Sequence, residues 1–131
     1  MKKIILAAVA SLSLLEACHK DRAIEPGLTG KWELRSSGGG FTGYYKNYNP
    51  GNGNILQFTT SNTYKQYEKF KLTNQGSYTI KKIPPVSGAV EVDSIYFSTG
   101  WADQIQVNRT KLILGTGIAD GIVSQYEKIG Q

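Results

Sequence analysis

From residue 30 onward, apolar and polar side chains alternate along successive short segments, and this period of two limits the fold more than any other feature. In the first segment, Trp32 and Leu34 alternate with Lys31 and Glu33. Successive side chains of a β-strand point to opposite faces of the sheet, so the alternation is typical of a strand with one buried face. No window of useful length has a helical period in this part of the chain. The sequence therefore predicts an all-β domain.

Seven further segments show the same alternation: residues 54–59, 64–72, 76–83, 90–97, 101–107, 112–114 and 122–129. The second of these is expected to turn Tyr64, Phe70 and Leu72 to one inward face. The apolar phase changes between Val92 and Ile95, which predicts a β-bulge. About eight strands with short polar connections are typical of an antiparallel up-and-down barrel, because closure removes the unpaired edges.

The N-terminus has the features of a bacterial lipoprotein export signal. Lys2 and Lys3 precede an apolar run over residues 4–15. This run is too short to span a bilayer, since a spanning helix needs about twenty apolar residues. Leu15-Glu16-Ala17-Cys18 resembles the lipobox, in which the cysteine is acylated and becomes the new N-terminus, although Glu16 departs from the small or hydroxyl residue that is usual there. The alternative is a first core helix of a cytoplasmic protein, with Cys18 as an ordinary buried thiol.

The lipobox resemblance implies three parts: a signal peptide over residues 1–17, a lipidated tether over 18–28 and a domain over 29–131. It also implies more than one acyl chain, of the palmitate kind, on Cys18. Each buried methylene adds about 0.8 kcal/mol of membrane affinity. His19-Lys20-Asp21 resembles the tags that follow the cysteine in surface-displayed lipoproteins of the Bacteroidetes. The expected location is the bacterial cell envelope, through a lipid anchor in the outer membrane, and the tag favours surface exposure.

Composition agrees with a β domain and argues against nucleic acid as a partner. The chain holds 15 glycines, eight tyrosines, four phenylalanines and two tryptophans. Of its 15 basic and 10 acidic side chains, residues 1–17 take two lysines and one glutamate, which leaves 13 and 9, a net charge of +4. The lysines are scattered and form no continuous basic track.

Catalysis has little support in the sequence. His19 in the tether is the only histidine and Cys18 the only cysteine, which excludes Ser-His and Cys-His pairs, internal disulfides and multi-histidine metal sites. The glycine run at residues 38–40 lacks the following lysine of a phosphate-binding loop. Glu68 and Asp103 are carboxylates that could do acid–base work, but nothing in their spacing singles them out. We expect no enzymatic activity, no metal and no cofactor.

The predicted domain resembles the lipocalins. Gly30-Lys31-Trp32 on the first strand resembles their Gly-x-Trp signature, and a last strand ending in Tyr126-Glu127-Lys128 is similar to short lipocalin-like lipoproteins of the Bacteroidetes. The resemblance implies an eight-stranded calycin barrel in which Trp32 closes the narrow end. Lipocalins usually pack an arginine across that tryptophan. Here only Lys128 is available, and it cannot fully reproduce a stacked guanidinium.

The segment between the first two strands, residues 38–54, is rich in glycine and aromatic residues. The resemblance places this connection over the open end of the barrel, where Tyr44, Tyr45 and Tyr48 would offer large contact area with polar tips. A glycan, a peptide or a protein would suit such a loop. The alternative is that these aromatics pack down as a plug or form a further strand against the sheet.

Further candidates for ligand binding lie on the strands. The alternation puts Gln66 and Glu68 on the inward face, and Asp103 with Trp101 on another. An inward carboxylate needs a hydrogen-bond donor or a cationic ligand, unless it sits near a strand end or a bulge and is solvated. Tyr78 is a further candidate for lining the interior.

Two functions of different class follow. The first is a membrane-anchored, lipocalin-like lipoprotein that binds a small apolar or amphipathic molecule in its cup. The second is a cell-surface interaction module with a filled barrel, which binds a protein or glycan through its tyrosine-rich loop. Interior volume discriminates between them, because bulky inward side chains such as Phe58, Tyr64 and Tyr126 would leave little room for a guest.

Overall fold

A computed structural model describes residues 27–83, 92–115 and 121–131 of the chain. These residues form only strands and connections. The strands are β1 (Gly30–Gly39), β2 (Tyr44–Asn47), β3 (Ile55–Phe58), β4 (Thr63–Glu68), β5 (Lys71–Ile83), β6 (Val92–Phe97), β7 (Ala102–Val107), β8 (Lys111–Gly115) and β9 (Ile122–Gly130). In the described ranges, no helix has the length and apolar character needed to cross a membrane. The predicted signal peptide, Cys18 and most of the tether lie outside the described residues.

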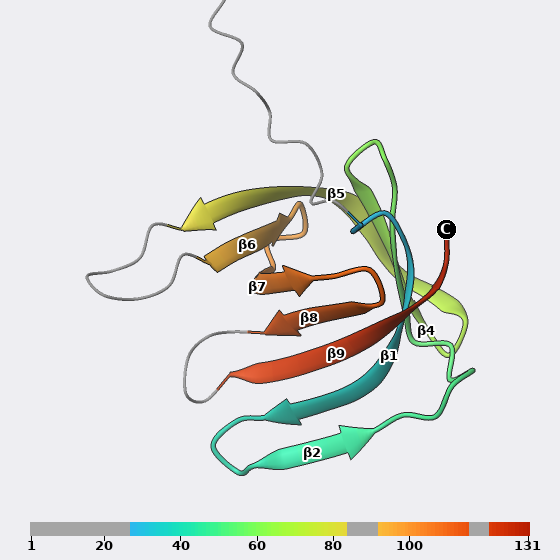
Figure 1. The fold of residues 1–131 in the computed structure, drawn as a ribbon, viewed down its shortest axis with the longest axis vertical. Coiled ribbons are helices and arrows are strands. Elements are labelled where there is room, and N and C mark those ends of the chain that lie inside the picture. Colours follow the sequence, from blue (N-terminus) through green and yellow to red (C-terminus); the bar gives the residue numbers. More distant parts are fainter. Residues whose placement is uncertain (1–26, 84–91, 116–120) are drawn as a thin grey trace, which may run out of the picture.

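The sheet closes into a barrel, which confirms the predicted fold class. Neighbouring strands pair antiparallel in the order β1-β3-β4-β5-β6-β7-β8-β9, and β9 pairs back onto β1. These eight strands form the wall (Figure 1). Lys31 pairs with Gly130, so the start of β1 and the end of β9 lie together at one end, which we call the base. The β1–β2 hairpin and the β4–β5 turn lie at the opposite end, which we call the mouth.

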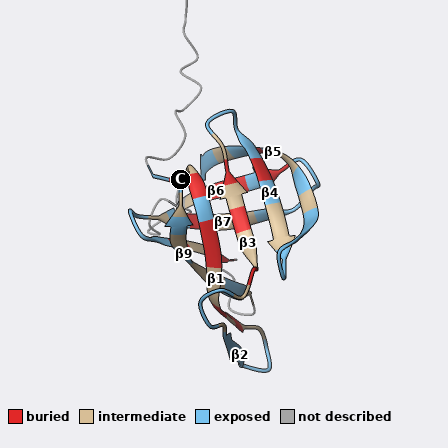
Figure 2. Ribbon diagram, turned by 90° about the vertical axis from the view of Figure 1, so that its right-hand side faces the viewer, coloured by how far each residue is buried: buried red, intermediate tan, exposed pale blue. Residues whose placement is uncertain are grey.

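The barrel interior is filled near the base by the residues that the alternation turns inward. The buried cluster consists of Leu28, Trp32, Leu56, Phe58, Tyr64, Tyr78, Ile95, Phe97, Ile105, Leu112 and Leu114. Figure 2 shows the buried positions as stripes across the strands. Phe58 meets Tyr78 edge to face, with ring centroids 5.1 Å apart, and Tyr64 meets Phe97 in the same way at 4.6 Å. Such packing leaves no room for a long guest at this level of the barrel.

Trp32 closes the base. Its side chain is completely buried, and its indole nitrogen donates a hydrogen bond of 2.7 Å to the carbonyl oxygen of Leu28. The Lys128 ammonium lies 5.3 Å from the centre of the indole ring and donates to the carbonyl oxygen of Gly27. A lysine thus covers the tryptophan through its charge rather than through a stacked guanidinium.

Two details of the predicted strands are wrong. The expected strand over residues 64–72 is split, because Lys69 and Phe70 both adopt positive φ and form the tight turn between β4 and β5. A bulge at Thr73 on β5 pairs Leu72 with the outward-facing Tyr67, so Leu72 points outward; Leu72 is 43% exposed and Phe70 67%. The register from Val92 to Phe97 is continuous, so the bulge expected there is absent. Bulges occur instead in the β1–β9 pairing, one of them at Arg35.

β2 is a ninth strand, formed by the tyrosine-rich segment. It pairs with the second half of β1, from Ser36 to Gly39, along the same edge that pairs with β3 nearer the base. Residues 48–54 lead from β2 to β3. The predicted loop is therefore partly a strand, as one of the two alternatives held, and Figure 2 shows β2 lying clear of the barrel.

Candidate functional site

A pocket opens at the mouth, between β2 and the β4–β5 turn, with a volume of about 300 Å³. This volume is at the lower end of the range of small-molecule sites. We call it the mouth pocket. It is lined by Leu34, Lys46, Tyr48, Asn54, Ile55, Leu56, Gln66, Tyr67, Glu68, Lys69 and Tyr126.

The floor of the mouth pocket is the mouth-facing side of the filled layer: Leu56 belongs to that layer, Tyr126 packs against it, and Leu34 is the next inward position after Trp32 on β1. Leu34 pairs with Tyr126 across β1 and β9, and Leu56 pairs with Gln66 across β3 and β4. Directly paired residues of antiparallel strands point to the same face, and these pairs continue the inward face of Trp32. The floor thus combines two aliphatic side chains with a phenol and an amide.

Tyr48 forms one wall of the pocket. Its backbone N–H donates to the carbonyl oxygen of Arg35 at 2.8 Å, which fixes the start of the β2–β3 connection on β1. The Lys46 ammonium lies 4.8 Å from the centre of the Tyr48 ring. An aromatic face and a cation therefore lie together at the rim of the mouth pocket.

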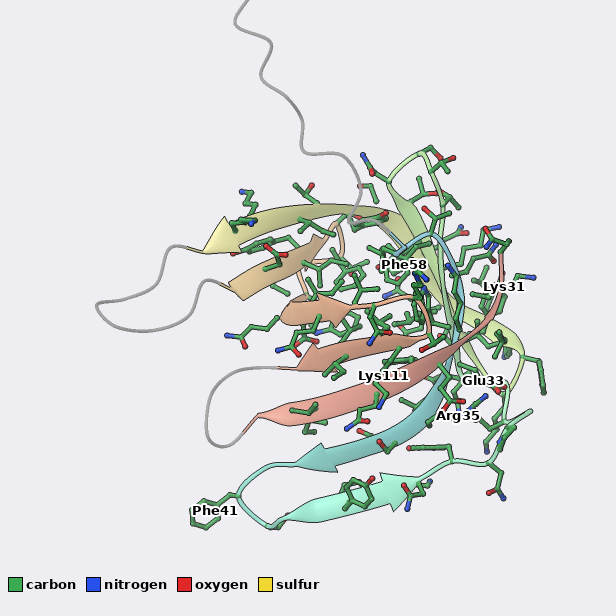
Figure 3. The ribbon with its side chains drawn as sticks, in the orientation of Figure 1. Lys31, Glu33, Arg35, Phe41, Phe58 and Lys111 are labelled. Carbon is green, nitrogen blue, oxygen red and sulfur yellow. The ribbon has the colours of Figure 1, made fainter. Side chains whose placement is uncertain are left out.

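A buried carboxylate holds the other side of this connection in place. Glu33 is 3% exposed, although it points away from the barrel interior. Its oxygens accept hydrogen bonds from the Arg35 guanidinium at 2.6 Å and from the backbone N–H groups of Gly51 and Gly53 at 3.0 and 3.1 Å. Arg35 also donates to Glu127 at 2.9 Å. Figure 3 shows Glu33 and Arg35 side by side on β1.

These contacts set the charge state of Glu33. Burial alone would raise the pKa of this carboxyl, but the hydrogen bonds from Arg35, Gly51 and Gly53 outweigh it and hold the pKa below its ordinary value of 4.5. Glu33 is therefore ionised at neutral pH. Its hydrogen bonds with Gly51 and Gly53 hold the β2–β3 connection in place, and this connection supplies Tyr48 and Asn54 to the mouth pocket.

The β4–β5 turn docks on the same connection. Gly53 has φ +72°, and its carbonyl oxygen accepts the N–H of Phe70 at 2.9 Å. The Asn54 side chain accepts the N–H of Lys69 at 3.3 Å. Two backbone segments thus meet at the rim of the pocket, where glycine permits the close approach.

Replacing Gly53 by alanine is expected to lower the free energy of unfolding by about 2 kcal/mol or more. The alanine would be held in a left-handed conformation, with its Cβ 2.6 Å from the backbone nitrogen of Phe70. Gly51→Ala is the matched control, because Gly51 has φ +79° but a Cβ added there would have no neighbour within 4 Å. Chemical denaturation of both variants measures the difference. Equal losses of unfolding free energy in the two variants would show that the close approach to the Phe70 backbone adds nothing to the cost of Gly53→Ala.

Behind the pocket wall, polar groups gather on the inward faces of β7 and β9. Burial, above all, raises the pKa of Tyr126 to about 12; the charges of Asp103 and Tyr48 add to the rise, and a hydrogen bond with Ser124 opposes it. Tyr126 is therefore a protonated donor at neutral pH. Burial also raises the pKa of Asp103, against a hydrogen bond from Trp101. This side of the mouth offers donors and acceptors to a polar group.

The predicted site residues divide into three sets. Tyr48, Gln66 and Glu68 line the mouth pocket, although Glu68 ends β4 beside the bulge and is exposed. Tyr44 and Tyr45 lie on β2, 54% and 64% exposed, and do not line the pocket.

The remaining three lie elsewhere in the fold. Tyr78 belongs to the filled core, and Trp101 stacks on Phe97 with ring centroids 4.4 Å apart. Asp103 faces inward and is half-buried near Tyr126, but it does not touch the pocket. The structure therefore brings three of the eight candidates to one place.

The hydroxyl group of Tyr78 is buried and has no hydrogen-bond partner among the described residues. We expect Tyr78→Phe to leave stability unchanged or to raise it by about 1 kcal/mol, because an unsatisfied buried polar group is removed. The matched control is Tyr64→Phe, which deletes a hydrogen bond of 3.0 Å to Thr99 and should cost about 1 kcal/mol. Thermal unfolding of both proteins distinguishes them, and a clear loss in Tyr78→Phe would contradict the expectation.

Sequence reasoning missed most of the pocket. Leu34, Leu56 and Tyr126 were inward positions, but nothing local marks them as lining a pocket at the mouth. These positions come together only when β1 pairs with β3 on one side and with β9 on the other, as in the closed barrel. Lys46 could be found only by recognising β2 as a strand, since its inward direction follows from pairing with Ser37.

Known proteins give no guide to this site: no protein-family model matches the chain, and no curated protein or solved structure is significantly similar to it. Within the described ranges, no group of three or more histidine, cysteine, aspartate or glutamate side chains could hold a metal ion. No family therefore supplies a function for the mouth pocket.

Proposed function

We propose that this protein is a cell-envelope lipoprotein, anchored through Cys18, whose barrel binds a small amphipathic molecule in the mouth pocket. The observation that carries the proposal is the pocket itself, whose floor combines the aliphatic Leu34 and Leu56 with the polar Gln66 and Tyr126. A site with apolar surface and a few placed polar groups suits a ligand of the same mixed character.

The filled layer limits the size of this ligand. Trp32, Phe58 and Tyr64 are each at most 1% exposed and occupy the barrel below the pocket. A long acyl chain would have to displace them, which costs several kcal/mol of packing. We therefore propose a ring-sized ligand, such as an aromatic alcohol or a phenyl glycoside, and not a fatty acid. The bound ring would lie on Leu34 and Leu56 with its hydroxyl groups toward Tyr126.

A thermal-shift panel tests the proposal on the full chain. Phenyl glycosides, indole alcohols, sterols and fatty acids are compared, and a ligand at a hundredfold excess over its Kd should add about 2.7 kcal/mol of stability. Gln66→Trp should abolish the shift, because the new ring fills the pocket. Gln57→Trp is the control, since Gln57 lies on the neighbouring strand and faces the opposite side. If no ring compound stabilises the protein, the proposal fails.

The second candidate function is the interaction module, and one observation favours it. Phe41, Tyr44 and Tyr45 are exposed together on the β1–β2 hairpin, Phe41 by 93% (Figure 3). Exposed aromatic side chains of this kind are typical of surfaces that contact a macromolecule. In the panel, failure of every small compound, with the fold intact, would favour this candidate.

A further inference from the structure

The charged residues that line the mouth pocket are unequal in sign. Lys46 on β2 and Lys69 in the β4–β5 turn are cations, and Glu68 at the end of β4 is the carboxylate among them. Two cations and one anion leave the lining of the described pocket with a net charge of +1. A ligand with a single negative charge would balance it.

The two cations border the pocket from opposite sides, because the pocket lies between β2 and the β4–β5 turn. Lys46 is opposite Ser37 and shares its inward face, and its ammonium lies 4.8 Å from the centre of the Tyr48 ring. Lys69 has φ +49°, and its backbone N–H donates to the side chain of Asn54 at 3.3 Å. Both backbones are thus held at the rim. An ammonium group only donates hydrogen bonds, so the two together call for an acceptor.

Neither rim cation is neutralised by a carboxylate in the described part of the chain. All ion pairs there involve Arg35, so Lys46 and Lys69 take part in none. Glu68 lies directly opposite Lys71 in the β4–β5 register, and opposed side chains of opposite charge attract each other. Lys71 does not line the pocket. The charge of Glu68 is therefore shared with a cation outside the pocket.

The field of the surrounding domain has the same sign as the rim. The described ranges hold 11 of the 15 basic side chains and 5 of the 10 acidic ones, a net charge of +6. One of the five acidic groups, Glu33, is buried and paired with Arg35. A field of one sign raises the local concentration of ligands of the opposite charge. The domain thus attracts anions toward the mouth and repels cations.

We propose that the mouth pocket selects an aromatic carboxylate, with its ring on Leu34 and Leu56 and its acid group at the rim. Lys46 and Lys69 would hold the carboxylate from opposite sides, in charge-assisted hydrogen bonds. A hydroxyl group on the ring would point toward Tyr126, which is protonated at neutral pH. This inference rests on the proposed function and adds the charge of the ligand to it.

A carboxylate fits the rim better than a phosphate group does. A carboxylate carries one negative charge and balances the +1 of the lining. A phosphate monoester carries about −1.5 to −2 at neutral pH, and Glu68 would repel the excess. The rim therefore favours a monoanion.

Isothermal titration calorimetry of the full chain tests the proposal with three compounds that share one ring: 4-hydroxyphenylacetate, its carboxamide and tyramine. The acid should bind about tenfold more tightly than the amide, because an exposed ion pair contributes up to about fivefold in Kd and two are formed. Tyramine, a cation, should bind most weakly. The preference for the acid should shrink in about 1 M salt, where the Debye length is about 3 Å.

Single substitutions locate the preference. Lys46→Gln and Lys69→Gln should each raise the Kd of the acid by up to about fivefold and leave the Kd of the amide unchanged. Lys65→Gln is the matched control, because it removes the same charge from an outward position of β4 that does not line the pocket. Lys46→Arg keeps the charge and should keep the preference.

Two results would overturn the carboxylate proposal. One is an amide that binds the wild type as tightly as the acid does. The other is an equal loss of acid affinity in Lys65→Gln and Lys46→Gln, which would assign the preference to net charge alone. In both cases, binding of the amide that Gln66→Trp abolishes would leave the mouth-pocket proposal standing. If none of the three compounds binds, this inference fails, while the wider thermal-shift panel decides the proposed function.

Discussion

Trp32→Ala is expected to lower the free energy of unfolding by about 3–5 kcal/mol. The side chain is completely buried at the base, so its removal leaves a large cavity between Leu28 and the strands above it. The variant also leaves the Leu28 carbonyl oxygen without its hydrogen-bond donor and removes the indole ring over which the Lys128 ammonium lies. Because domains of this size are stable by about 5–15 kcal/mol, the loss is a large share of the total. Equilibrium denaturation in urea measures it.

Trp32→Phe separates packing from hydrogen bonding. It keeps most of the apolar surface but deletes the 2.7 Å bond to Leu28, so we expect a smaller loss of about 1–3 kcal/mol. If Trp32→Ala costs less than Trp32→Phe, or if either is neutral, Trp32 does not hold the base closed.

Glu33→Ala is expected to cost about 3–5 kcal/mol, because one partner of a buried ion pair is removed. Arg35 loses its 2.6 Å contact, and the N–H groups of Gly51 and Gly53 lose their acceptor. The connection that carries Tyr48 should loosen as well. We therefore expect the affinity for a ligand in the mouth pocket to fall together with the free energy of unfolding. Glu127→Gln is the control, since Glu127 is the exposed partner of Arg35 and such pairs contribute at most about 1 kcal/mol.

The pH dependence follows from the direction of the pKa shift. The pKa of Glu33 is lower in the folded protein than the ordinary value of 4.5, so its stabilising contribution is present above pH 4.5. That contribution is lost as the pH falls through the lowered pKa of the folded state. The stability difference between the wild type and Glu33→Gln should therefore shrink on acidification. A difference that stays constant between pH 7 and pH 3 would contradict the role of the ionised carboxylate.

The barrel could be predicted because alternation alone identifies the inward positions. Trp32, Leu56, Phe58, Ile105 and Leu112 are all buried, as their phase requires. A strand with one face toward a core fixes its register strongly, since a slip of one residue exposes the whole apolar set. Closure was expected because it leaves no unpaired edge, and the pairing of β9 with β1 provides it.

The β4–β5 turn could not be predicted, because its signal is not local. Lys69 and Phe70 are not usual turn residues, and alternation continues through them. What holds both in positive φ is the docking of their N–H groups on Gly53 and Asn54, fifteen or more residues earlier. Tertiary contacts override the strand pattern here.

The burial of Glu33 could not be predicted for a related reason. Alternation places it on the outward face, where an acidic residue is normally solvated. It is buried only because residues 49–54 fold back over β1 and direct two N–H groups at its carboxylate. The lipid anchor and the location in the envelope stay predictions, because Cys18 lies outside the described residues.

The most direct test of ligand binding at the mouth is a titration of isotope-labelled protein, followed by nuclear magnetic resonance, with the ring compound that stabilises it most. The account predicts saturable shift changes that are largest at the backbone amides of Leu34, Leu56, Gln66 and Tyr126. Saturable changes confined to residues 41–47, with these four amides unmoved, would contradict it.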